Sequence, residues 1–176
     1  MDLDRPIAPE PYGLLPTVPA LTLRSDDLED GVPMPGPFTA EGGSTSPELH
    51  WSAVPPGTQS VMISCFDPDA PTPAGYWHWT VWDLPADIGS LPTGAGTPSG
   101  NRLPAGARQA RHDGGEHGYL GAAPPPGDRA HRYVFAVHAL DTPSLGLTEE
   151  TTPTSVAFTA LFHTLARGTL TPTFQH

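Results

Sequence analysis

Lysine is absent from this 176-residue chain, and cysteine occurs only once. A lone cysteine, Cys65, excludes a disulfide within the chain, so a reducing compartment is expected. The first residues lack the basic and apolar regions of a signal peptide, and no apolar run is long enough to span a membrane. We therefore expect a cytoplasmic protein without a transmembrane segment.

Positive charge is scarce as well. The eight cations are all arginine and are outnumbered by 19 acidic residues, which gives a formal net charge of −11. Phosphate backbones and anionic membrane surfaces repel a chain of this charge. Nucleic acids and bilayers are therefore disfavoured as partners, and an anionic ligand would need a local cluster of donors.

Long stretches with helical periodicity are rare, whereas glycine (19) and proline (24) are abundant. They alternate with runs rich in Val, Ile, Phe and Trp, a pattern typical of a mainly β protein with many turns. Residues 1–20 are proline-rich and are predicted to form an arm, either loose or laid across the surface. Residues 21–176 are long enough for one domain with a single sizeable core.

Three apolar segments bounded by turns are predicted as strands, namely 59–66, 76–84 and 131–140. Shorter strands are expected at 21–23 and 48–51. The stretch 93–118 is glycine-rich and without period, and we expect it to form a mobile lid over a pocket. Together these segments predict a mostly antiparallel β-sandwich with long loops.

One helix is predicted near the C-terminus. Thr152 suits the N-cap, Pro153 the first helical position and Gly168 the position just past the end. An apolar stripe is expected to pack this helix on a sheet. Its members are Val156, Leu161, Phe162 and Leu165.

Alternation along the strands brings ionisable side chains together. In the segment 131–140, His131 and Tyr133 share one face. In the segment 76–84, His78 lies on the face opposite Trp77 and Trp79. His78 can therefore join the other two residues in a common cavity if these strands are neighbours.

Asp67 and Asp69 follow the first of these strands, in a turn stiffened by Pro68 and Pro71. Because a carboxylate repels an anion, we expect Asp67 to accept an imidazole N–H, which favours the imidazolium form. Two imidazoles and a phenol beside it would form a receptor for an oxyanion such as phosphate, carboxylate or sulfate. The expected walls are Trp77, Trp79, Pro71 and Pro125.

Several motifs occur together in this chain. They are DPDAP at 67–71, WHW at 77–79, GYLG at 118–121, and PPPG at 124–127 followed by HRY at 131–133. With these motifs the chain resembles the phosphatidylethanolamine-binding proteins, and among them the bacterial Raf-kinase-inhibitor-like branch (YbhB/YbcL type). The resemblance extends over roughly residues 20 to 174.

The resemblance implies a Greek-key sandwich of two antiparallel sheets with a pocket for phosphate or a phospholipid headgroup. It implies a cis bond between Ala70 and Pro71, with Asp69 stabilising the turn, and a homodimer. Ala123 lies where many relatives carry glycine and is expected to crowd a bound phosphate. The implied ligand-binding residues are Asp67, Pro71, His78, Gly121, Pro125, His131 and Tyr133.

Three functions stay open at this point. The first is a non-catalytic binding protein for a small anion, with no cofactor or metal. The second is a regulator of a kinase or another enzyme. The third is a hydrolase in which His131 or His78 acts as general base on a small ester or phosphoester, oriented by Asp67. His138 and Cys65 are interpreted as structural residues.

Overall fold

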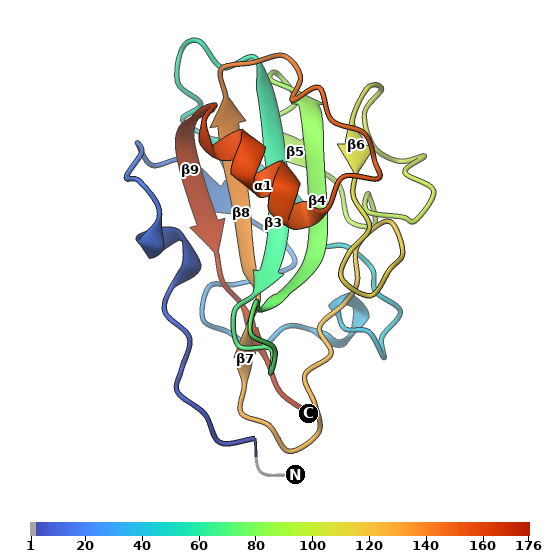
Figure 1. Cartoon of the computed structure of the whole chain (residues 1–176). Coiled ribbons are helices and arrows are strands. Elements are labelled where there is room, and N and C mark those ends of the chain that lie inside the picture. The colour runs from blue at the N-terminus through green and yellow to red at the C-terminus, as the bar shows by residue number, and fades with distance from the viewer. Residues whose placement is uncertain (1–2) are drawn as a thin grey trace.

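The computed structural model describes residues 3–176 (Figure 1). Within them the chain forms one α-helix, α1 (Pro153–Leu161), and two 3₁₀ helices, η1 (Pro11–Leu14) and η2 (Gly36–Phe38). Most regular elements are strands, as predicted. They are β1 (Thr22–Arg24), β2 (Leu49–Ser52), β3 (Ser60–Asp67), β4 (Tyr76–Pro85), β5 (Ser90–Leu91), β6 (Arg108–Gln109), β7 (His131–Arg132), β8 (Val134–Leu140), β9 (Thr164–Leu170) and β10 (Thr173–Phe174).

The strands form antiparallel sheets of different size. The largest has the order β6-β4-β3-β8-β9, and a smaller one has the order β1-β2-β5. Residues of both sheets share one apolar core, while α1 covers the other face of the large sheet (Figure 1). The small sheet, the large sheet and the helix are therefore three successive layers.

A third sheet, of β7 and β10, adds to the two that were predicted. It arises because the segment 131–140 is not one strand. At Tyr133 the backbone N–H leaves the ladder and donates to the Pro172 carbonyl at 3.0 Å. This break separates β7 from β8 and carries His131 beyond the large sheet.

The main core lies between the two larger sheets. Its fully buried side chains come from β2, β3, β4 and β8, among them Leu49, Ile63, Trp79 and Phe135. A second cluster, including Met62 and Val156, lies between the large sheet and α1. Burial of apolar side chains on both faces explains why β3 is a continuous apolar run rather than an alternating one.

The predicted helix is correct at its start and wrong at its end. The Thr152 hydroxyl accepts from the Ser155 N–H as N-cap, and Pro153 follows it. The helix ends at Leu161, and Gly168 lies inside β9, where its lack of a Cβ lets the Leu21 carbonyl approach. Pairing of residues 164–170 with β8 has overridden the helical pattern. Phe162 consequently faces solvent and is 70% exposed.

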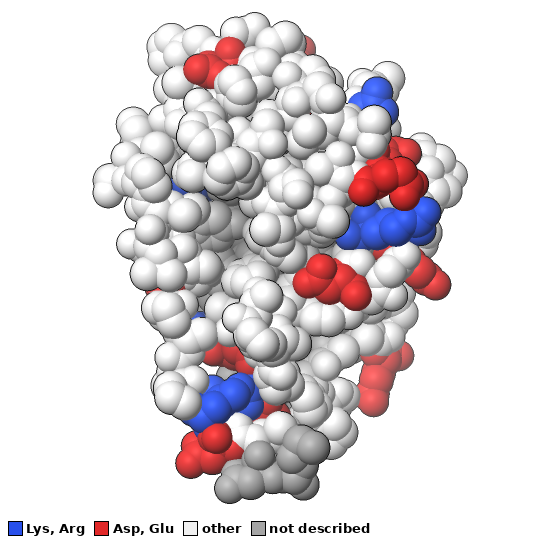
Figure 2. Space-filling view, in the orientation of Figure 1, with Lys and Arg blue, Asp and Glu red and all other residues white. Residues whose placement is uncertain are grey.

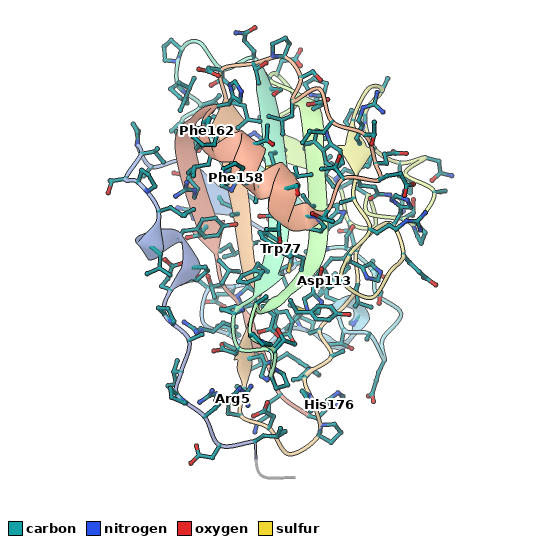
Figure 3. All side chains as sticks on the ribbon, in the orientation of Figure 1. Arg5, Trp77, Asp113, Phe158, Phe162 and His176 are labelled. Atoms are coloured by element: carbon teal, nitrogen blue, oxygen red, sulfur yellow. The ribbon has the colours of Figure 1, made fainter. Side chains whose placement is uncertain are left out.

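A bulge in β4 corrects the predicted sides of the tryptophans. Cys65 pairs with Trp79 and Phe66 pairs with Trp77, so His78 is an extra residue on this strand. Trp77 lies toward α1, where its indole N–H donates to Thr154 at 3.1 Å (Figure 3). Trp79 is fully buried in the main core. The two rings therefore occupy opposite faces.

The two irregular segments are both anchored. In the stretch 93–118, Arg108–Gln109 pairs with β4, and the Asp113 N–H donates to the Trp77 carbonyl at 3.0 Å. The arm formed by the first 20 residues was predicted to be either loose or laid across the surface, and its described part lies along the domain. Its η1 docks through Tyr12, whose hydroxyl is 2.9 Å from the Ser64 hydroxyl. Residues 1 and 2 of the arm lie outside the described residues.

Candidate functional site

Three strands of the large sheet meet at one end and bring the predicted residues together. Asp67 closes β3 and pairs with Tyr76 at the start of β4, while Phe66 pairs with Val134 at the start of β8. His131 therefore lies beside Asp67, with 2.7 Å between Nδ1 and Oδ2. Antiparallel pairing of distant segments builds this site.

His131 is held between two carboxylates. Its Nδ1 contacts Asp67, and its Nε2 lies 2.9 Å from Oδ2 of Asp128. Burial by itself lowers the pKa of His131, but the hydrogen bonds to Asp67 and Asp128 outweigh burial and raise it. Two acceptors on one ring are satisfied together only when both nitrogens carry protons, so this arrangement favours the imidazolium form of His131.

His78 and Tyr133 form the other half of the site. Their rings meet edge to face with centroids 5.1 Å apart. Nδ1 of His78 lies 3.0 Å from the Leu120 carbonyl, and burial lowers the pKa of His78, which favours the neutral ring. Burial raises the pKa of Tyr133, and the nearby Asp67 raises it further. His78 is thus neutral where His131 is cationic.

The Tyr133 hydroxyl is an unusual feature of this half. Its side chain is fully buried, and although the Ala123 backbone lies near its oxygen, no acceptor for its proton is found among the described residues. A buried phenol without a partner is costly, because its water contacts are lost and not replaced. The hydroxyl is therefore a donor that a ligand can satisfy.

Asp69 organises the turn after β3. Its backbone N–H donates to Oδ1 of Asp67 at 2.7 Å, and its carboxylate accepts Nε and a terminal nitrogen of Arg132 at 2.7 and 2.8 Å. Burial alone raises the pKa of Asp69, but the Arg132 hydrogen bonds outweigh it and lower the pKa. The Ala70–Pro71 bond is trans, since no peptide bond of residues 3–176 is cis. The predicted cis bond is wrong; the Arg132 fork and the Asp67 carboxylate hold this turn instead.

Two residues that the sequence analysis missed complete the site. Asp128 lies on the turn before β7, and Arg5 comes from the arm. Arg5 places two nitrogens on the Asp128 carboxylate at 2.8 and 3.0 Å, and one of them is 3.3 Å from Nε2 of His131. Figure 3 shows Arg5 at the lower end of the molecule, remote from α1. For Asp128, the one sequence signal of a role in the site is its position three residues before His131. For Arg5, the sequence gives no such signal.

The remaining predicted residues lie at the edge of the site or support it. Pro71 and Ala123 are exposed and Pro125 is partly buried, so Ala123 does not fill the interior. Gly121 is buried because its backbone approaches Thr39, where an added Cβ would come within 2.2 Å of the carbonyl carbon. Trp77 and Trp79 do not form walls here.

No residue of the site is arranged as a metal ligand set in the described chain. The one group of suitable ligand atoms among residues 3–176 is Asp26, Glu48 and His50, at the outer surface beside β2. Cys65 is fully buried next to the site, and burial raises the pKa of its thiol, which disfavours the reactive thiolate.

Comparison with known proteins places this arrangement in a family. The model of the phosphatidylethanolamine-binding protein family matches residues 24–175. The chain belongs to this family. The UPF0098 protein YbhB of Escherichia coli K12 is 43% identical over 160 residues, which cover 88% of this chain and all of YbhB. YbcL of the same organism is 44% identical over 138 residues, which cover 78% of this chain and 75% of YbcL.

Solved structures agree with this assignment to the phosphatidylethanolamine-binding protein family. The crystal structure of E. coli YbcL, a member of the mammalian PEBP family, superposes with a TM-score of 0.87 at 38% identity. The alignment covers 89% of this chain and 98% of YbcL. A Chlamydia trachomatis homologue, CT736, superposes with a TM-score of 0.76 at 29% identity, and the alignment again covers 89% of this chain and 98% of the homologue. None of the helices in residues 3–176 has the length and apolar character that a membrane span requires.

Proposed function

We propose that this member of the phosphatidylethanolamine-binding protein family binds a small oxyanion, either free phosphate or the phosphate of a phospholipid headgroup. The observation that carries the proposal is that the His131 ring and the Tyr133 hydroxyl, which has no acceptor, both lie near Asp67. The positive charge of His131 suits the charge of a phosphate group, and the Tyr133 hydroxyl offers a donor to its oxygens. His78 supports Tyr133 from the side.

A binding role fits the site better than hydrolysis does. A general base needs a nitrogen with a free lone pair, and His131 has both ring nitrogens engaged by carboxylates. His78 donates its Nδ1–H to a backbone carbonyl, so its lone pair is on Nε2, but burial lowers its pKa and makes it a weak base. The non-catalytic function is therefore our proposal. A kinase or other protein partner, a homodimer and a cytoplasmic location stay predictions from the resemblance.

Isothermal titration calorimetry with inorganic phosphate and with phosphoethanolamine tests the proposal. We expect saturable binding that weakens as pH rises through the raised pKa of His131, because the imidazolium loses its charge there. The double variant His78→Ala, His131→Ala should lose the heat of binding. The matched control His50→Ala, His163→Ala changes two half-buried rings outside the site, each also paired with a carboxylate, and should keep the heat of binding. Equal heats from both double variants would contradict the proposal.

A further inference from the structure

The cationic nitrogen of the site is closed to solvent. His131 is 1% exposed, and its Nε2 points at Asp128 from 2.9 Å. The Arg5 guanidinium covers the same atom from 3.3 Å. An external anion therefore cannot reach Nε2 of His131 while the Asp128 carboxylate stays where it is.

Asp128 occupies the position of an oxyanion. Its carboxylate receives two nitrogens of Arg5 in a fork and the Nε2 proton of His131. A forked guanidinium together with an imidazolium also suits two oxygens of a phosphate, so carboxylate and phosphate compete for one set of donors. The Arg5 hydrogen bond and then that of His131 hold the pKa of Asp128 well below its ordinary value, which favours the charged carboxylate.

Arg5 is fastened independently of Asp128. Arg129 donates to the carbonyls of Arg5 and Pro6 at 2.7 and 3.0 Å, and Arg132 donates to the carbonyl of Ala8 at 2.7 Å. Arg129 and Arg132, which flank His131 in the sequence, therefore hold the backbone of the arm in place. If the Asp128 side chain turns away, the Arg5 guanidinium consequently stays beside the site.

The charge balance of the site favours displacement of the Asp128 carboxylate when an anion enters. Carboxylates of Asp67, Asp69 and Asp128 are matched by the cations His131, Arg132 and Arg5. Figure 2 shows the same mixture at this end of the molecule, where basic atoms are surrounded by acidic ones. Adding an anion next to Asp128 would create a repulsive pair at short distance. Entry of the ligand and displacement of Asp128 are therefore coupled.

We infer that Asp128 is a built-in competitor that occupies the oxyanion position, and that an incoming phosphate displaces it and takes Arg5 of the arm as a second cationic partner. This inference rests on the proposed anion-binding function. It assigns Asp128 as an autoinhibitory residue and Arg5 as a ligand-binding residue. It also makes the arm part of the binding site.

Two substitutions with opposite expected effects test the inference. Asp128→Asn removes the charge but keeps an oxygen that can accept from Arg5 and from the Arg129 N–H. The amide NH₂ cannot accept from Nε2 of His131, so that proton becomes available to the ligand. We expect inorganic phosphate to bind Asp128→Asn about tenfold more tightly than the unchanged protein.

Arg5→Gln should act in the other direction. It removes the fork while the arm stays attached through its carbonyls, and phosphate should bind about tenfold more weakly, also in the Asp128→Asn background. The controls are Asp141→Asn, which alters an exposed Asp–His pair, and Arg111→Gln, which alters an exposed Arg–Glu pair. Both should leave the affinity unchanged. Thermal melts of all variants establish that they are folded.

Titration calorimetry with inorganic phosphate and with phosphoethanolamine then separates the outcomes. Tighter binding by Asp128→Asn supports the inference, also where the unchanged protein binds too weakly to detect. Phosphate binding that Asp128→Asn does not strengthen, or that Arg5→Gln does not weaken, overturns the inference and leaves the proposed function standing. No binding by any of the proteins overturns both. A preference for phosphoethanolamine would identify a headgroup rather than free phosphate as the source.

Discussion

At the scale of single residues, two histidines of this protein have opposite environments. His131 lies between carboxylates, which raise its pKa. His138 lies in β8 beside Tyr12 and Arg167, and burial, followed by the Arg167 charge, lowers its pKa to about 3. The first ring is kept charged and the second neutral. Interpretation of His138 as structural agrees with this placement.

We expect NMR titration to place the pKa of His131 above the ordinary 6.5. Because a raised folded-state pKa stabilises the charged form, His131 contributes stability below pH 6.5 that is lost as pH rises through its folded pKa. Asp128→Asn should lower this pKa, since it removes one of the two charged acceptors. A His131 pKa at or below 6.5, or one that Asp128→Asn leaves unchanged, would contradict the assignment of an imidazolium.

The sign is reversed for His138. Its pKa is depressed in the folded state, so its contribution to stability is complete above pH 6.5 and is lost as pH falls toward about 3. His138→Gln should flatten the fall in unfolding free energy in this range by at most about 1.4 kcal/mol per pH unit, the value for one proton. Urea unfolding between pH 4 and 6.5 measures it, with His163→Gln as control. Identical pH slopes for both variants would show that His138 is not buried neutral.

At the scale of elements, some parts of the fold follow from local sequence and others do not. The turns and apolar runs predict β3 and β4 to within one residue, and the Thr152–Pro153 pair predicts the start of α1. The predicted strand 131–140 ends where β8 ends but merges β7 and β8 into one element. The helix predicted from Thr152 to just before Gly168 extends into β9, because β9 is fixed by its pairing with β8 and local sequence does not reveal that partner. The two-residue strands carry no periodicity at all.

The candidate site likewise has some residues that local sequence predicts and others that it does not. The period of two of a strand predicts His131 and Tyr133 on one side, and the place of Asp67 at a strand end predicts it beside an imidazole, which the contact with His131 confirms. The extra residue at His78 could not be foreseen, because a bulge is set by the pairing partner. Arg5 could not be foreseen either, since only folding brings the arm to residue 128.

A substitution at Gly121 tests whether the loop that contains it packs closely against the backbone of Thr39. An added Cβ would lie 2.2 Å from the Thr39 carbonyl carbon, too close without a backbone shift. Gly121→Ala should therefore destabilise the protein by roughly 1–3 kcal/mol. Gly36→Ala, in the nearby η2, meets nothing within 4 Å and is the matched control. Denaturant unfolding compares the two; equal stabilities would contradict the packing.

At the scale of the whole molecule, the site is assembled from segments that span nearly the entire chain. Arg5 near one end of the chain, Asp67 at the end of β3 and His131 in β7 meet at one end of the sandwich. The Gln175 side chain also donates to the Asp128 carbonyl at 2.8 Å. Ligand binding here should consequently stabilise the whole fold, by about 2.7 kcal/mol when free phosphate is at 100 times its dissociation constant.

The most direct test of the anion site is ¹⁵N NMR of the imidazole rings during titration with inorganic phosphate at pH 6. We predict a saturable shift of His131 Nε2 as phosphate replaces Asp128, with a smaller change at His78 and none at the half-buried rings of His50 and His163. If His131 does not respond, or if all four rings drift together without saturation, the proposed oxyanion receptor is contradicted.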